Sequence, residues 1–181
     1  EISACLVGSE MCIRDSSLVA VLWGLLWSLS ALAGMVYAGT VLRRMQLATI
    51  EPGHRPITLG STFAVLVIGA ALFNMSGMIS TTWTSFGSGS TTYGAISYSG
   101  ADSFGRFKDA VNAVLTLASF AGGCFFFKGL LLMKKAALEG ESSQGGDDAI
   151  WRGLTHMIFG AALTHVDKVI EAFQATFQLY W

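Results

Sequence analysis

The C-terminal stretch from Trp151 to Trp181 reads WRGLTHMIFGAALTHVDKVIEAFQATFQLYW, and its pattern decides the expected fold. Thirty helical steps of ~1.5 Å give about 45 Å, which matches a bilayer with its headgroups, and aromatic residues stand at both ends. The sequence therefore predicts a membrane-spanning helix over residues 153–178. Small and polar residues recur at steps of three and four and share one helical face, the polar stripe: Gly153, His156, Gly160, Thr164, Asp167, Glu171, Gln174 and Gln178.

The charges within this helix require partners. Asp167 and Lys168 together cost roughly 5–7 kcal/mol on the insertion scale, and the Leu, Ile, Val and Phe residues return only about 3–5 kcal/mol. The stripe should therefore face other helices, a partner subunit or water. A helix lying flat on the membrane and a soluble bundle remain as alternatives. The candidates for helix packing or partner contact are His156, Gly160, Thr164, Asp167, Lys168, Glu171 and Gln174.

Composition points to the membrane for the whole chain. The 181 residues are 52% hydrophobic and only 13% charged, with a mean hydropathy of +0.56. Soluble domains carry about 25% charged residues, so we expect a protein that contacts the lipid bilayer. A net charge of −1 gives no electrostatic case for nucleic-acid binding.

Residues 1–16, EISACLVGSEMCIRDS, resemble a translated sequencing adapter. The codons possible for Met11 to Ser16 can spell the transposon end used in preparing sequencing libraries. We therefore expect these residues to be foreign and treat 17–181 as a single membrane domain. Cys5 and Cys12 belong to the excluded stretch. Only Cys124 remains, so no disulfide framework is expected.

Four apolar stretches predict an all-α bundle of four transmembrane helices, at about 18–42, 57–79, 110–133 and 153–178. The first contains Ser30, Gly34 and Ala38 at four-residue spacing, which suits close helix packing. Between the second and third lies STTWTSFGSGSTTYGAISYSGADSFG, residues 80–105. This Ser/Thr/Gly-rich loop holds several aromatic residues, so we expect an ordered, contact-making loop more than a flexible linker.

Basic residues predict the orientation. They gather in the first loop at Arg43, Arg44 and Arg55 and around the third at Lys134, Lys135 and Arg152. The positive-inside rule places those loops in the cytoplasm. Both termini and the 80–106 loop should then lie in the periplasm of a bacterial inner membrane.

A short repeat favours two similar hairpins. The tetrad Gly69-Ala70-Ala71-Leu72 recurs as Gly160-Ala161-Ala162-Leu163, at an offset of 91 residues. The same offset carries the pair 43–44 onto 134–135. Parallel repeats are a known membrane architecture, although small-residue tetrads are also frequent in unrelated membrane helices.

No catalytic signature of a metalloprotease, a serine hydrolase, a P-loop or a dinucleotide-binding protein occurs. His156 lies on the stripe and His165 off it, which argues against one compact metal site. No cofactor and no enzyme activity are expected. Asp167 and Glu171 could belong to a proton path, since intramembrane carboxylates often do, but a role in helix packing is favoured.

The chain resembles the IcmC/DotE family of type IVB secretion systems and its plasmid relative TraQ over most of residues 30–181. The likeness rests on the order of the four spans, on Arg43-Arg44 and on three runs: TTWTSFG at 81–87, FFFKGLLLM at 125–133 and RGLTH at 152–156. The chain departs in its start, its DDAIW lead-in and its DKVIE cluster. The family has no established catalytic residues.

The resemblance implies a non-enzymatic structural component of an apparatus that moves effector proteins or DNA–protein complexes across the bacterial envelope. Its partners would be other membrane subunits of that complex, and a homo-oligomer is a further possibility. The alternative function is a small ion- or proton-conducting channel that uses the polar stripe.

Overall fold

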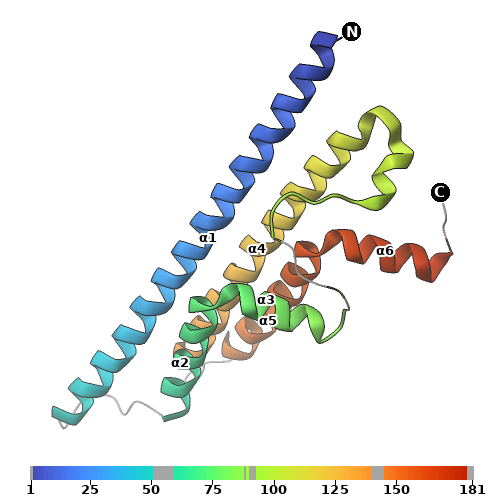
Figure 1. The fold of residues 1–181 in the computed structure, drawn as a ribbon. Coiled ribbons are helices and arrows are strands. Elements are labelled where there is room, and N and C mark those ends of the chain that lie inside the picture. The colour runs from blue at the N-terminus through green and yellow to red at the C-terminus, as the bar shows by residue number, and fades with distance from the viewer. Residues whose placement is uncertain (1, 51–58, 88, 90–92, 140–144, 179–181) are drawn as a thin grey trace.

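The computed structural model describes residues 2–50, 59–87, 89, 93–139 and 145–178, with side chains described from Ser17 onward except at 49, 59, 104, 139 and 145–147. Every regular element within these ranges is a helix, which confirms the all-α prediction for this part of the chain. In order they are α1 (Ile2–Ile50), α2 (Leu59–Phe73), α3 (Met75–Thr84), the 3-10 helix η1 (Ser99–Phe107), α4 (Lys108–Glu139), α5 (Gly145–Thr164) and α6 (Val166–Phe177) (Figure 1).

Two helices are long and apolar enough to cross a membrane. They cover Ser17–Ala48 of α1 and Gly105–Leu138, which runs from the end of η1 through α4, and they contain the predicted spans 18–42 and 110–133. The outward face of α1 is apolar along most of its length, as expected for a surface in contact with lipid. The residues that are half or more exposed there are Leu18, Val21, Leu25, Leu29, Leu32, Met35, Val36 and Leu42.

The other two predicted spans are not single helices. The second divides into α2 and α3, which meet at a bend of 96°. The last divides into α5 and α6, and Figure 1 shows α6 leaving the axis of α5 sideways. The described residues thus hold two spanning helices, or three when the bent pair counts as one, and the predicted number of four is not confirmed.

The two breaks have the same backbone geometry. They lie at Asn74 (φ −114°, ψ 54°) and His165 (φ −110°, ψ 42°), which are 91 residues apart. Asn74 N donates to Ala70 O, and His165 N donates to the matching Ala161 O. Each break residue also accepts a hydrogen bond from the residue four positions later. The repeat seen in the sequence therefore extends to the backbone, which supports two similar hairpins.

A serine from the facing helix binds a carbonyl at each break. Ser30 of α1 donates its hydroxyl to Leu72 O, and Ser119 of α4 donates to Thr164 O at 2.8 Å. A side chain that takes a helical carbonyl competes with the regular helical hydrogen bond and favours a kink there. Asn74 adds a side-chain cap, because its Oδ1 accepts from Gly77 N. The hydroxyls therefore explain where the helices bend.

Glycines let the hairpin helices approach closely. A Cβ on Gly34 would lie 2.6 Å from Gly69 O, which shows how near α1 and α2 come. Between α4 and α5, a Cβ on Gly122 would meet Gly160 O at 2.7 Å, and one on Gly129 would meet Gly153 O at 2.8 Å. The hydrophobic effect does not drive association between helices in a membrane, so close packing of this kind holds the antiparallel helices together.

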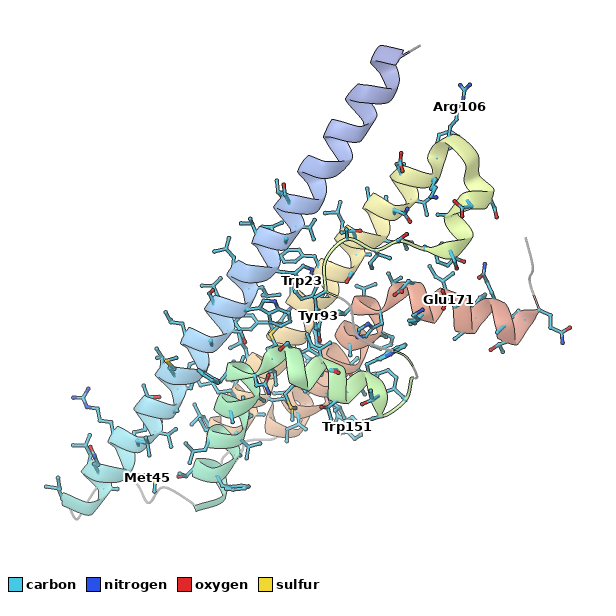
Figure 2. All side chains as sticks on the ribbon, viewed as in Figure 1. Trp23, Met45, Tyr93, Arg106, Trp151 and Glu171 are labelled. Atoms are coloured by element: carbon cyan, nitrogen blue, oxygen red, sulfur yellow. The ribbon has the colours of Figure 1, made fainter. Side chains whose placement is uncertain are left out.

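The loop after α3 packs onto the bundle. Figure 2 shows Tyr93 beside Trp23, and their ring centroids lie 5.3 Å apart. Tyr93 Oη donates to Ser76 O, and Ile96 N donates to Thr116 Oγ1. The prediction of a contact-making loop is therefore confirmed for these residues. The main core beneath the loop consists of Val19, Trp23, Leu26, Ala71, Leu72, Met75, Ile79, Phe126, Leu130 and Ala161.

Candidate functional site at the junction of α3, α5 and α6

Two aromatic rings meet where α3 crosses the break between α5 and α6. The rings of Trp83 and His165 have centroids 4.9 Å apart, and the residues are only 5% and 3% exposed. Neither Trp83 Nε1 nor His165 Nε2 has a hydrogen-bond partner among the described residues. Unpaired buried polar atoms are uncommon in proteins and mark this junction as unusual.

A tight turn follows the last residue of α3. Gly87 N donates to Trp83 O at 2.7 Å, and the ring of Phe86 packs edge-on against the indole at 5.6 Å. A Cβ at position 87 would lie 2.6 Å from the Trp83 ring, so only glycine fits this turn without a shift. The turn thereby holds the indole in place and leaves Phe86 half exposed.

A surface pocket of about 880 Å³ lies between this turn and the start of α6. One wall comes from the end of α3 and the turn, and the other comes from α5 and the first two turns of α6. Its lining residues are Trp83, Thr84, Ser85, Phe86, Gly87, Ala162, Lys168, Val169, Glu171 and Ala172.

An ion pair lies in the α6 wall of the pocket. Lys168 Nζ is 3.1 Å from Glu171 Oε2, and the side chains are 37% and 41% exposed. The spacing of three residues puts both on one helical face. Asp167 is partly buried in the first turn of α6, where the helix dipole favours a carboxylate. The pocket therefore presents one cation and one anion side by side.

The segment before α4 fixes α6 against the bundle. Tyr98 Oη donates to Gln174 Oε1 at 2.8 Å, and Tyr98 N donates to Asn112 Oδ1. Val166 and Ile170 of α6 pack against a second small core that contains Tyr98. Gln174, a residue of the predicted stripe, thus makes its contact within the chain.

The α5 part of the stripe faces α4. Thr164 is 1% exposed, and its hydroxyl donates to Gly160 O. A Cβ on Gly160 would lie 2.6 Å from Phe126 N, so α4 lies directly against this glycine. His156 lies apart, with Nδ1 2.7 Å from Arg152 O. The stripe is therefore divided: Gly160 and Thr164 lie between helices, whereas Asp167, Glu171 and Gln174 lie on α6, as does the further candidate Lys168.

His156 also borders a small apolar cavity. The cavity measures about 270 Å³ and lies between α4 and α5. Its other lining residues are Phe125, Thr155, Phe159 and Leu163.

No group of three or more His, Cys, Asp or Glu side chains that could hold a metal occurs in the described ranges. The arrangement at the junction suits binding through charge and hydrogen bonds.

The site residues predicted from the sequence do not include Trp83, Tyr98 or Ser119. A signal for Trp83 was present, because the run TTWTSFG places a tryptophan and a glycine four residues apart at a helix end. Ser119 lies three residues before Gly122, and Ser30 lies four residues before Gly34. A serine about one helical turn before a glycine is therefore found in the first helix of each hairpin.

Comparison of the chain with protein-family models, with curated proteins and with solved structures finds no match.

Proposed function

We propose that the chain is a non-enzymatic structural subunit of a type IVB secretion or conjugation apparatus in a bacterial inner membrane. The observation that supports an assembly role is the exposure of α6. None of its twelve residues is fully buried. The end of the helix lies outside the bundle and carries two aromatic side chains, which are the kind of residue that is usually buried. Phe173 and Phe177 are 56% and 59% exposed, and their rings lie 4.4 Å apart. Aromatic patches of this kind are common at protein–protein interfaces.

The hydrogen bonds inside the bundle also favour assembly over conduction. A pore along the polar stripe would need Gly160 and Thr164 to face water. Both instead lie against α4, and the Thr164 carbonyl accepts from Ser119. A conducting path through one chain along this stripe is therefore not supported by these contacts. Under the channel alternative, only Asp167 and Glu171 on α6 remain to line a path, and that path could form only together with other chains.

Substitution of the two carboxylates of α6 tests the proposal. We expect Asp167→Asn with Glu171→Gln to lower substrate transfer and co-purification of partner subunits together. Loss of the charges leaves polar neighbours without their counterparts in a low-dielectric setting. The purified protein in liposomes should show no ion flux that depends on these residues.

The matched control removes a charge pair at the other end of α5. Asp148 and Arg152 form an exposed pair at 2.7 Å, and Asp148→Asn with Arg152→Gln should leave transfer and co-purification unchanged. One outcome would favour the channel over the structural role. In that outcome the wild-type protein conducts ions, and the α6 double variant loses the flux but still binds its partners.

A further inference from the structure

The imidazole of His165 is buried at the point where α5 ends and α6 begins. The side chain is 3% exposed, and its ring centroid lies 4.9 Å from that of Trp83, an arrangement called here the closed junction. Its Nε2 atom has no hydrogen-bond partner within the part of the chain that the structure describes. An imidazolium donates from both ring nitrogens, so burial without an acceptor favours the neutral ring. The face of the indole attracts a cation, but rings tilted by 41° provide only part of that attraction.

The elements that contact α5 and α6 bring few charged groups to this imidazole. Residues 75–87 of α3 and the following turn contain no titratable side chain. Between residues 111 and 127, α4 contains only the exposed thiol of Cys124, and α5 between 153 and 164 contains only His156. On α6, Asp167 favours a protonated ring, whereas Lys168 and Glu171 are paired with each other.

The balance of these effects favours the neutral form. His165 lies in the break between α5 and α6, outside the two helices that are long enough to cross a membrane. Burial lowers the pKa of His165, and the carboxylate of Asp167 offsets only part of this effect. The closed junction therefore binds a proton more weakly than a histidine in water does.

Helix α6 is attached to the bundle by few contacts. It points away from the axis of α5, and none of its residues is buried (Figure 1). Val166 and Ile170 pack against the small core that contains Ala101, and Gln174 accepts a hydrogen bond from Tyr98. Segments with few buried contacts open at a low cost in free energy. The break itself, where the backbone is not helical (φ −110°, ψ 42°), is the joint about which α6 can turn.

We propose that protonation of His165 opens this junction. The imidazolium leaves Trp83 for water, where both of its N–H groups find acceptors, and α6 turns about the break, away from the core that contains Ala101. Since the open junction binds the proton more tightly, a fall in pH shifts the equilibrium towards it. Closure is fully favoured above the ordinary histidine pKa of ~6.5 and weakens as the pH falls below that value. The movement occurs within one chain and does not depend on which apparatus the chain serves.

Thiol accessibility of the purified full chain in lipid nanodiscs tests the proposal. In a background without Cys5, Cys12 and Cys124, Ala101→Cys introduces a probe beneath α6, where residue 101 is 0% exposed. Its rate of reaction with a pyridyl disulfide, which reacts at acid and neutral pH, is divided by the rate at an exposed reference, Ser97→Cys. This ratio measures the fraction of open junctions. We expect it to rise severalfold, and at most about thirtyfold, between pH 8 and pH 5, because an exposed histidine gains its proton over that range.

Variants of the junction identify the group that takes up the proton. His165→Phe keeps an aromatic ring against Trp83 but has no site for a proton, so its ratio should not change with pH. His165→Gln is a second uncharged variant and should behave alike. Asp167→Asn removes the carboxylate that favours the imidazolium in the closed junction, so its response should be at least as large as that of the wild type. His156→Phe is the matched control and should respond as the wild type does.

Three outcomes would overturn the proposal. The first is a ratio that does not depend on pH in the wild type. The second is a response that persists in both His165→Phe and His165→Gln. The third is a response that is lost in Asp167→Asn or in His156→Phe, because the titrating group would then be the carboxylate or the other histidine.

Discussion

The hydroxyl of Ser119 lies 2.8 Å from the carbonyl oxygen of Thr164, directly before the backbone break at His165. This hydrogen bond joins α4 to α5 at the residue where the last helix leaves the bundle. It occupies a carbonyl that would otherwise accept the next helical hydrogen bond, so it couples the packing of two helices to the direction of α6.

The first prediction concerns a substitution that removes this hydroxyl. Ser119→Ala should lower the free energy of unfolding by about 0.5–1.5 kcal/mol, because one hydrogen bond between helices is lost. Reversible unfolding in mixed micelles measures the change. Ser28→Ala is the control, since Ser28 is exposed and donates to Gly24 O within its own helix. A cost at Ser28 equal to that at Ser119 would contradict the assignment.

The second prediction concerns the closest contact between α4 and α5. Gly160→Ala should destabilise the protein by about 1–3 kcal/mol, since the new Cβ would lie 2.6 Å from Phe126 N and the helices must separate. Gly24→Ala introduces the same methyl group where no atom lies within 4 Å. Its effect should be neutral or stabilising by up to about 1 kcal/mol, as for alanine in other helices. Equal effects of the two substitutions in thermal unfolding would refute the close contact.

The third prediction concerns orientation, which rests on the basic residues. Single cysteines at Ser97, near η1, and at Ala48, at the end of α1, are both at exposed positions. In a background without Cys124 and the two N-terminal cysteines, an impermeant thiol reagent should label position 97 on intact spheroplasts and leave position 48 unlabelled. The positive-inside rule predicts this pattern. The reverse labelling would invert the topology.

Much of the helical architecture could be predicted from hydropathy. The runs 18–42 and 110–133 became parts of α1 and α4 because twenty or more apolar residues in sequence have few alternatives to a spanning helix. The division of the last helix could not be predicted in this way. Hydropathy does not register the conformation of one residue, and the break at His165 depends on Ser119, a residue 46 positions earlier on another helix.

The candidate site, too, could be predicted from the sequence only in part. The sequence placed Asp167 and Glu171 on one face of a helix and named Lys168 as a further contact candidate, and the structure pairs Lys168 with Glu171. It gave no indication that Trp83 would lie against His165, because that contact requires α3 to turn by 96° from α2. Local spacing therefore identified the charges of the pocket but not its opposite wall.

We propose that α6 carries the contact between this chain and its neighbours. A photo-reactive amino acid at Phe177, at the exposed end of α6, tests it in cells that assemble the apparatus, with Leu29 on the lipid-facing side of α1 as the matched control. The two side chains are 59% and 57% exposed. We expect a specific cross-link from position 177 to another membrane subunit and none from position 29. Cross-linking to a subunit from position 29 alone, or from neither position, would show that α6 does not carry this contact.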